Sequence, residues 1–307
     1  MKQVYGNREV VNVLVINRTR GEKIFDIMNI LLMLGLVIVT LYPFIYIVFA
    51  SMSDPRQLSG AGSILLRPKG FSLIGYVAVF RSSNIYIGYA NTLFYVLVGT
   101  SVNILMTSIF AYVLSRKNVY WNKMIMIMVV ITMIFHGGLI PTFLWMRELG
   151  LYDTRAVLIL RTMIASWNLI IMRTSFMGIP DSIEESAKID GANDIKILFR
   201  IILPMSKAVL SVMILFYAVQ HWNSWFDAMI YLRRRSLYPL QLFLREILIL
   251  SSLDDIAQNM GFEENQALIS DNIKYATIIV STLPILCVYP FLQKHFAKGV
   301  MIGAIKG

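Results

Sequence analysis

Stretches without a charged residue alternate along this chain with shorter charged segments, so charged residues mark where each stretch begins and ends. A helix rises about 1.5 Å per residue, and about 20 apolar residues cross a hydrocarbon core of about 30 Å. The pattern predicts an all-α polytopic membrane protein with six transmembrane helices. The predicted spans are Ile27–Ser53, Ile87–Leu114 within the longer stretch Ser82–Ser115, Met124–Met146, Ala156–Met172, Ala208–Phe226 and Tyr275–Gln293.

The composition agrees with a chain that lies in lipid. Hydrophobic residues make up 57% of it and charged residues 15%, with a mean hydropathy of +0.65, which is too apolar for an ordinary soluble protein. In a soluble chain the net charge of +10 would suggest nucleic acid, whereas in a membrane protein lysine and arginine decide which flank stays in the cytoplasm. These residues are more frequent on the flanks that the two ends share, so we predict cytoplasmic termini and no nucleic-acid partner.

The sequence lacks the residue patterns of common catalytic and metal sites. It contains no GxxxxGK[ST], HExxH, GxSxG or GxGxxG pattern, and its three histidines are far apart. Cys287 is the single cysteine and has no histidine at metal-ligand spacing. We therefore expect no catalytic residue, metal site or cofactor in this chain, which leaves transport or anchoring as its function.

The segment between the fourth and fifth predicted spans has the pattern of a short, separate helix. Pro180 and Asp181 end the preceding helix, and Ser182 with Glu185 three residues later matches a capping box that starts a new one. Gly191 suits the left-handed turn that ends so short a helix. The pattern predicts a compact helix that projects on the cytoplasmic side.

The two faces of this short helix differ in character. Glu184 and Lys188 form an i, i+4 pair on the predicted hydrated face, while Ile183 and Ala187 share the other face. The alternative to a functional helix is a surface helix that only joins two spans.

The same loop carries a motif with fixed spacing. Glu185-Ser186-Ala187, then Gly191 after three intervening residues, then Ile201, Leu203 and Pro204 match the pattern EAA, three residues, G, nine residues, I-x-L-P. This pattern resembles the loop of permease subunits of binding-protein-dependent ABC importers, with Ser186 in place of the middle alanine. The extension Asp190-Gly191-Ala192 is similar to the carbohydrate-uptake branch, whose members resemble the maltose permease subunit.

The resemblance implies that this short helix contacts a separate ATPase subunit and transmits its closure to the spans. The implied coupling residues are Glu184, Glu185, Ser186, Ala187, Asp190, Gly191, Ala192, Ile201, Leu203 and Pro204. It also implies a domain of residues 87–307, with a coupling loop at 177–205 and an external loop at 227–274. Residues 1–86 then hold the N-terminal cytoplasmic segment, the first span and an external loop.

Four further segments resemble the subgroup that imports complex oligosaccharides and polysaccharide fragments. The segments are His136–Thr142, Trp222–Ala228, Tyr238–Arg245 and Phe296–Gly307.

The resemblance also implies partners and a location. The implied partners are a second permease subunit in a heterodimer, two ATPase subunits that bind ATP and Mg, an extracytoplasmic solute-binding protein, and an oligosaccharide substrate. The implied location is the bacterial plasma (inner) membrane.

Six polar or amphipathic residues in predicted membrane segments are candidates for a substrate pathway, because planar side chains bond sugar hydroxyls and aromatic faces pack on sugar C–H groups. The alternative for each asparagine is packing between helices, and Arg161 could instead reach the outer interface. His136 and the glycines after it could form a close-packed helix crossing. The candidates are Asn91, Asn103, His136, Arg161, Trp167 and Asn168.

The segment after the fifth span is the predicted contact for the external binding protein. It contains two apolar pieces, Ser236–Leu244 and Ile247–Leu253, that are too short to cross a bilayer and are expected to form an amphipathic element outside it. A solvated turn is the alternative for its arginine cluster. The contact candidates are Arg233, Arg234, Arg235, Tyr238 and Gln241.

We therefore predict a permease subunit of an ABC importer that takes up oligosaccharides or polysaccharide fragments by ATP-driven alternating access. Three other functions remain open at this point. They are an importer of another solute, such as a glycerol-phosphate or an amino acid, a membrane enzyme that uses His136 and Arg161 on a lipid-linked sugar, and a passive membrane anchor.

Overall fold

The computed structural model describes residues 19–59, 64–259 and 272–287, and the regular elements in this part of the chain are helices. An isolated antiparallel bridge pairs Ser53 with Phe71. The elements are α1 (Arg20–Ser51), α2 (Pro55–Ser59), α3 (Ile74–Arg81), α4 (Ser83–Phe94), η1 (Tyr95–Gly99), α5 (Thr100–Ser115), α6 (Asn122–Ile134), α7 (Leu139–Glu148), α8 (Arg155–Leu160), α9 (Ser166–Met177), α10 (Asp181–Ile189), α11 (Asp194–Ile197), η2 (Leu198–Ile202), α12 (Leu203–Met205), α13 (Lys207–Trp222), α14 (Trp225–Tyr231), η3 (Arg235–Leu237), α15 (Leu240–Asn259) and a helix at Asn272–Cys287.

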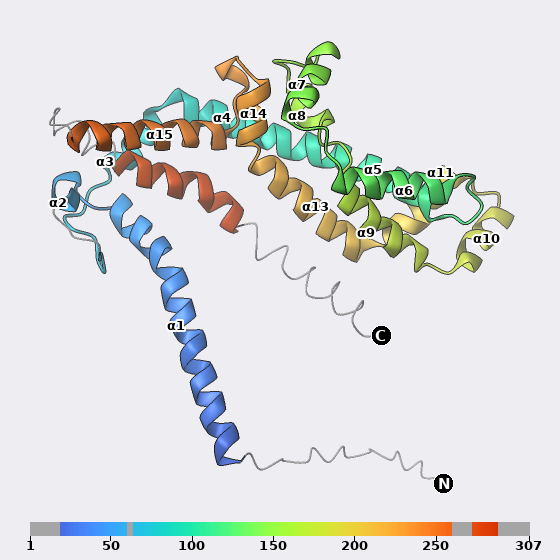
Figure 1. Cartoon of the computed structure of the whole chain (residues 1–307), viewed down its shortest axis with the longest axis horizontal. Helices are drawn as coiled ribbons and strands as arrows, with labels where there is room; N and C mark the ends of the chain where they lie inside the picture. The colour runs from blue at the N-terminus through green and yellow to red at the C-terminus, as the bar shows by residue number, and fades with distance from the viewer. Residues whose placement is uncertain (1–18, 60–63, 260–271, 288–307) are drawn as a thin grey trace, which may run out of the picture. The chain divides into compact units, whose positions relative to one another are not determined.

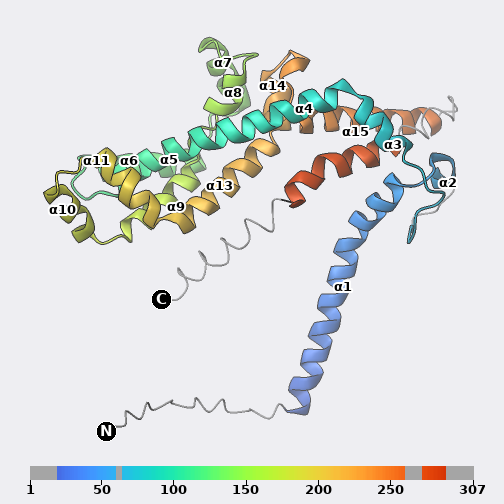
Figure 2. The same cartoon turned by 180° about the vertical axis from the view of Figure 1, so that it is seen from behind.

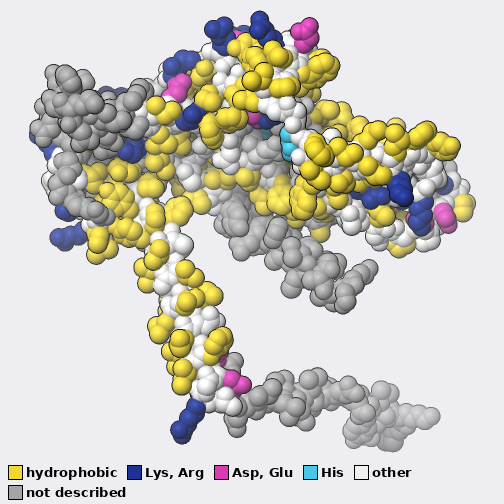
Figure 3. Space-filling model, viewed as in Figure 1, with side chains coloured by type: hydrophobic (Ala, Val, Ile, Leu, Met, Phe, Trp, Pro, Cys, Tyr) yellow, Lys and Arg dark blue, Asp and Glu magenta, His cyan; other side chains and the backbone are white. Residues whose placement is uncertain are grey.

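The chain divides into two units, residues 1–47 and 48–307. Most of α1 belongs to the first unit, and its apolar window has a mean hydropathy of 2.5. The helix begins before the predicted Ile27 because its charged first turn is capped: the Thr19 N–H donates to Glu22 Oε2 at 2.8 Å, and the Glu22 N–H donates to Thr19 Oγ1 at 3.3 Å. Nearly all of its side chains are exposed, and hydrophobic ones cover its surface, as expected of a helix in lipid (Figure 3).

In the second unit, α4, η1 and α5 form one continuous helix, Ser83–Ser115, of 33 residues. We call this element the long helix. It includes a single π-helical turn, η1, and α5 packs against α9 and α13 while α4 packs against α15 (Figures 1 and 2). The second predicted span is thus present as a helix, and it is the central support of this unit.

Other predicted spans are broken in the structure. α6 and α7 are bent by 118° at the break that contains Gly137 and Gly138, and the segment Asp194–Met205 is bent by 89° from α13. Residues 161–165 separate α8 from α9 without helix. By length and composition, two helices of the described part can cross a membrane, or up to four if each bent pair is one span. The count of six therefore stays a prediction.

The segment after α13 contains one long helix, and its predicted position outside the membrane stays a prediction. The two short apolar pieces Ser236–Leu244 and Ile247–Leu253 lie largely on one helix, α15, of 20 residues, because Arg245 and Glu246 continue the helix between them. The last predicted span appears as the helix Asn272–Cys287, and its remaining predicted residues lie outside the described part of the chain.

Three apolar clusters hold the second unit together. The first joins α5, α9, α10, η2 and α13, the second joins η1, α8, α14 and α15, and the third joins α3, α4, α15 and the helix Asn272–Cys287. α10 is tied to the first cluster by Ala187, which is 8% exposed, and Phe176 and Met213 of that cluster are fully buried. The short helix is therefore packed on the bundle, at the end of α5 (Figure 1).

We expect Gly88→Ala to lower the unfolding temperature of the detergent-solubilised protein, because a Cβ at this position would lie 2.9 Å from Leu240 Cα and 3.0 Å from Phe243 Cδ2. Such overpacking costs about 1–3 kcal/mol. Gly35→Ala in α1 is the matched control, since a Cβ there meets no described atom within 4 Å. Equal unfolding temperatures for the two variants would show that α4 and α15 are not packed as described.

Candidate functional site

α10 begins two residues earlier than the predicted capping box would place it. Its N-cap is Pro180, and Asp181 is already helical, so Ser182 lies inside the first turn and makes no side-chain cap. The hydroxyl of Ser186 donates to the carbonyl oxygen of Ser182 at 2.8 Å. The predicted capping box of Ser182 and Glu185 is therefore wrong, because the fixed geometry of Pro180 sets the start of the helix.

The end of α10 agrees with the prediction. Gly191 has φ +76°, its N–H donates to Lys188 O at 3.0 Å, and the Ala192 N–H donates to Ala187 O at 2.9 Å. This pair of bonds is a Schellman motif, which requires the left-handed conformation that glycine adopts without strain. The predicted left-handed turn at Gly191 is confirmed.

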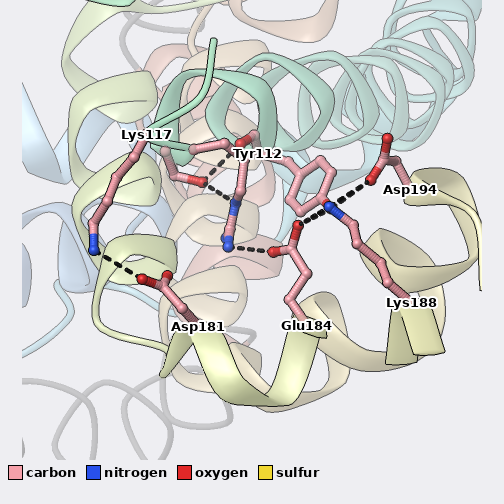
Figure 4. Close-up of polar contacts among 8 residues, drawn as sticks. Tyr112, Lys117, Asp181, Glu184, Lys188 and Asp194 are labelled. Atoms are coloured by element: carbon pink, nitrogen blue, oxygen red, sulfur yellow. Dashed lines mark hydrogen bonds and ion pairs between the residues drawn. The ribbon is translucent and has the colours of Figure 1, made fainter. Parts of the chain in front are cut away.

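Glu184 is buried, although the i, i+4 pattern placed it on the hydrated face. Its Oε1 accepts hydrogen bonds from the Tyr112 hydroxyl at 3.1 Å and from Lys188 Nζ at 3.0 Å, and its Oε2 pairs with Arg116 Nη1 (Figure 4). The predicted pair with Lys188 is confirmed, but the hydrated face is wrong for Glu184. Two side chains from the end of α5 draw the carboxylate inward. We call Tyr112, Arg116, Glu184 and Lys188 the Glu184 cluster.

The two cations of the Glu184 cluster face two carboxylates, because Asp194 Oδ1 of α11 lies 3.5 Å from Lys188 Nζ beside Glu184. The side chains of Arg116 and Glu184 are only 12% and 9% exposed, and the guanidinium lies 4.8 Å from the centre of the Tyr112 ring. Arg116 Nε also donates to Ser115 Oγ at 3.1 Å. The hydrogen bond to Glu184 raises the pKa of Lys188. Removing one partner of a buried ion pair typically costs about 3–5 kcal/mol, so the cluster holds α10 firmly against α5.

A second ion pair joins the same segments but is exposed. Lys117 Nζ lies 2.8 Å from Asp181 Oδ2, and the two side chains are 85% and 58% exposed. Their hydrogen bond and mutual charge raise the pKa of Lys117 and lower that of Asp181. Water and salt screen such a pair, so it contributes little to holding α10.

The end of α5 is also bound to α6 and α9. Arg173 Nε of α9 donates to Leu114 O at 2.7 Å, and Asn122 Nδ2 of α6 donates to Leu114 O at 2.9 Å and to Arg116 O at 2.8 Å. These donors satisfy carbonyl groups that a helix end leaves free. α6, α9 and α10 therefore all meet the long helix at its C-terminal end.

The other predicted coupling residues lie on two sides of this contact. Glu185, Ser186 and Asp190 are exposed, as is Pro204, while Ile201 and Leu203 are partly buried against the first apolar cluster together with Ala192. A groove of about 470 Å³ runs between α5, α10 and α11, and Tyr112, Val113, Glu184, Ile195 and Phe199 are among the residues that line it. The two neighbouring glutamates of the motif thus differ, because Glu185 is exposed and Glu184 is buried.

Asn103, a predicted pathway residue, is fully buried within the bundle. Its Nδ2 donates to Thr162 O at 2.6 Å and Met163 O at 2.9 Å, and its Oδ1 lies 2.6 Å from His221 Nε2. Thr162 and Met163 belong to the interruption between α8 and α9, where the Tyr217 hydroxyl accepts from the Ala165 N–H at 3.2 Å. These contacts favour the packing alternative for Asn103, because backbone groups freed within a membrane need partners.

Asn91 fastens the segment after α14 to the long helix. Its Nδ2 donates to Ser236 O at 2.8 Å and Tyr238 O at 3.1 Å, and its Oδ1 accepts from Arg155 at 3.0 Å. The Tyr95 hydroxyl donates to Leu237 O at 2.8 Å, one helical turn further along. These contacts also favour the packing alternative for Asn91.

The other predicted pathway residues have different environments. Arg161 is partly buried, pairs with Asp227 of α14 and lies 5.7 Å from the centre of the Tyr231 ring. Asn168 is buried on α9, Trp167 is 61% exposed, and His136 is exposed in the break between α6 and α7. A Cβ at Gly137, next to His136, would meet no described atom within 4 Å, so the predicted close-packed crossing does not occur within the described chain. The structure therefore does not bring the six pathway candidates into one site.

Asp153 organises the arginine cluster after α14. Its Oδ1 accepts from the backbone N–H groups of Arg233 at 2.9 Å and Arg234 at 3.0 Å, and its Oδ2 accepts from Arg234 Nε at 2.9 Å. Burial alone would raise the pKa of the Asp153 carboxyl, but these donors lower it overall. Arg235 pairs with Glu246 at 2.6 Å. The backbone of the cluster is thus fixed by Asp153, while the three arginines are exposed, so the solvated turn stays an alternative.

Tyr238 and Gln241 lie beside this cluster and are both partly buried. The Tyr238 hydroxyl lies 3.4 Å from Arg233 O, and its ring centre lies 5.7 Å from that of Phe243. All five contact candidates therefore fall in one region, between α14 and the first turn of α15.

Several residues that build these sites belong to no pattern in the sequence that would identify them. They are Tyr112, Arg116, Asp153, Tyr217 and Asp227. A buried glutamate requires a cation, but the sequence does not show that Glu184 is buried. Among the described residues no group of three side chains could hold a metal ion.

Comparisons with known proteins place this architecture. The chain matches the family described as binding-protein-dependent transport system inner membrane component over residues 98–302. It is 41% identical over 291 residues to the protein LplC of Bacillus subtilis strain 168, covering 95% of this chain and 98% of that protein. It is also 41% identical over 287 residues to the polygalacturonan/rhamnogalacturonan transport system permease protein YtcP of the same strain, covering 93% and 99%.

A solved structure also resembles this one. It is a chain of a bacterial ABC transporter involved in the import of the acidic polysaccharide alginate, with a TM-score of 0.82 and 32% identity. The match covers 91% of this chain and 99% of that chain.

We expect Asn103→Leu to lower the unfolding temperature of the detergent-solubilised protein, because it removes hydrogen bonds to Thr162 O, Met163 O and His221. Hydrogen bonds within membrane bundles average about 0.6 kcal/mol, so the loss is about 2 kcal/mol. Asn223→Leu is the control, since Asn223 is exposed and its Nδ2 bonds Val219 O of its own helix. A wild-type unfolding temperature combined with lost transport would instead favour a pathway role for Asn103.

Proposed function

Because this chain belongs to the binding-protein-dependent transport system inner membrane components, we propose that it takes up oligosaccharides or polysaccharide fragments by ATP-driven alternating access. It is a permease subunit of an ABC importer in the inner membrane, it crosses that membrane more than once, and it is not itself an enzyme. Its fold is the all-helical permease fold. The family requires a binding protein, ATPase subunits and a second permease as partners.

Carbohydrate as the substrate class is supported by what the similar proteins transport. YtcP is a polygalacturonan/rhamnogalacturonan permease, and the solved structure belongs to an alginate importer. Both substrates are polysaccharides. The rival substrates, a glycerol-phosphate or an amino acid, have no comparable support among these relatives.

The proposed arrangement in the membrane has six spans with both termini in the cytoplasm. Residues 1–86 form the N-terminal segment, first span and external loop, and residues 87–307 form the transport domain. The segment Phe296–Gly307, which carried part of the subgroup resemblance, lies outside the described residues. The long helix, which places α10 at its C-terminal end, fits a cytoplasmic position of that end.

The proposed assembly pairs this chain with a different permease, so that the sugar passes between the two. Two ATPase subunits bind ATP and Mg on the cytoplasmic side, and the solute-binding protein docks outside. The docking region is the arginine cluster Arg233–Arg235 with Tyr238 and Gln241, which Asp153 and Asn91 hold in place. His136, Arg161, Trp167 and Asn168 remain proposed pathway residues, each with the environment given above.

α10 is the proposed coupling helix. One observation carries this assignment: α10 has a buried side that is fixed to α5 by Glu184, while Glu185 and, at the helix end, Asp190 are exposed. A helix that is fixed to the bundle on one side and accessible on the other can transmit the movement of a partner subunit to the bundle. Closure of the ATPase subunits would move α10, and the bundle would follow and open to the outside.

We expect Glu185→Ala and Gly191→Pro each to abolish sugar-stimulated ATP hydrolysis by the assembled importer in vesicles. The first removes the exposed carboxylate, and the second cannot adopt φ +76° and removes the bond from the Gly191 N–H to Lys188 O. Glu148→Ala is the matched control, because Glu148 is exposed at the end of α7, away from the motif. Coupling that is unchanged in the two variants would contradict the assignment of α10.

We expect vesicles that contain the complete importer to accumulate labelled oligogalacturonate or arabino-oligosaccharide in the presence of its binding protein and ATP. Glycerol-3-phosphate and amino acids serve as controls and are expected to remain outside. Uptake of either control without any saccharide uptake would favour the rival importer. Turnover of a lipid-linked sugar by the purified chain alone would favour a membrane enzyme.

A further inference from the structure

Two neighbouring glutamates of α10 have opposite environments. Glu184 is 7% exposed and bound within this chain, whereas Glu185 is exposed. Glu184 therefore cannot meet another subunit while the Glu184 cluster is intact. Its carboxylate contacts side chains at the end of α5, so any role of Glu184 in the coupling must act through that helix.

The backbone at both ends of α10 is a turn. The chain enters through Pro180, the N-cap, and leaves through the left-handed turn at Gly191. Turns absorb changes of φ and ψ more readily than helices do. Without side-chain contacts, a displacement of α10 by a partner would therefore change the two turns and would not be transmitted to the bundle. The buried contacts available are Ala187 in the first apolar cluster and Glu184 in its own cluster.

The Glu184 carboxylate is the strongest polar link between the two helices. It accepts from Tyr112 and Arg116 at the end of α5 and from Lys188 on its own helix. Charge-assisted bonds of this kind are stronger than neutral ones, and low exposure strengthens them further. The exposed pair of Lys117 and Asp181 joins the same segments without these advantages.

The other half of the long helix is bonded to the arginine-cluster region. Asn91 donates to Ser236 O and Tyr238 O, and the Tyr95 hydroxyl donates to Leu237 O. The long helix is continuous from Ser83 to Ser115, so α10 and the 236–238 segment are attached to one element. The views of Figures 1 and 2 agree that α10 and α15 lie toward opposite ends of that element.

From this geometry we infer that the long helix, attached to α10 by Glu184, Arg116 and Tyr112 and to the 236–238 segment by Asn91 and Tyr95, relays motion between the ATPase contact and the binding-protein contact. Glu184 is a positioning residue in this relay. α10 and α5 move as one body, and docking outside and ATPase closure inside are coupled through that body. The inference rests on the proposed function of α10.

The first test measures whether α10 and α5 move together. Spin labels are attached to cysteines at Ser182 on α10 and Phe110 on α5, both exposed, with Cys287 replaced by serine in the complete importer. The distance between the labels is expected to be the same with and without bound ATP, and to change between these states after Glu184→Gln. A distance that already changes in the wild-type background would overturn the inference.

The second test measures the stimulation of ATP hydrolysis by the sugar-loaded binding protein. Glu184→Gln is expected to lower the ratio of stimulated to unstimulated hydrolysis by about tenfold while the ATPase subunits still copurify. Asp181→Asn, which removes the exposed pair, is the matched control and is expected to retain the wild-type ratio. The exchange of Glu184→Arg with Arg116→Glu is expected to restore stimulation that the single changes lose.

Asn91→Leu at the other end of the long helix is expected to give the same loss of stimulation, while Asn223→Leu is not. If Glu184→Gln alone prevents assembly, the double exchange decides: recovered stimulation supports the relay and absent recovery overturns it. Wild-type stimulation in Glu184→Gln, combined with lost stimulation in Glu185→Ala, would overturn the relay and leave the coupling helix in place. Wild-type stimulation in Glu185→Ala would instead overturn the proposed function.

Discussion

The pairing of a buried carboxylate with a buried guanidinium is the constraint on which the position of α10 depends. Glu184 and Arg116 are both largely withdrawn from water, and neither charge is tolerable there without the other. Apolar packing at Ala187 alone would leave a nine-residue helix free to rotate on the bundle. The ion pair fixes which side faces the bundle, and thereby which acidic residue, Glu185, faces outward.

A similar constraint governs the interruptions of the membrane helices. Where α8 stops, backbone groups that a helix would have paired are taken by Asn103 and Tyr217 from α5 and α13. The side-chain amides of Asn91 and Asn103 thus donate their hydrogen bonds to backbone carbonyl groups outside α-helices. Neither amide has a free donor for a sugar hydroxyl. The exposed residues of α10 and of the arginine cluster lie toward the two ends of the long helix.

Local patterns in the sequence predicted the features that depend on neighbouring residues. The left-handed turn at Gly191 and the pair of Glu184 with Lys188 follow from short spacing, and both are present. The burial of Glu184 was not predictable, because Arg116 and Tyr112 lie 68 and 72 residues away and no pattern connects them. The interruption at residues 161–165 was missed for the same reason, since it lacks glycine and proline and is stabilised by a distant asparagine.

The ion pair of Arg161 and Asp227 has a consequence for the chemistry of an acidic sugar. Asp227 already serves as counter-ion to the guanidinium, so Arg161 itself does not offer an unpaired positive charge. A uronate that reached Arg161 would have to displace the aspartate, and the displaced carboxylate would need a new partner or a proton. Passage of an anionic saccharide past this point would therefore exchange one carboxylate for another at Arg161. The attraction between the uronate and Arg161 would largely replace the attraction lost by Asp227. The free energy of the exchange would then depend mostly on the new environment of the Asp227 carboxylate.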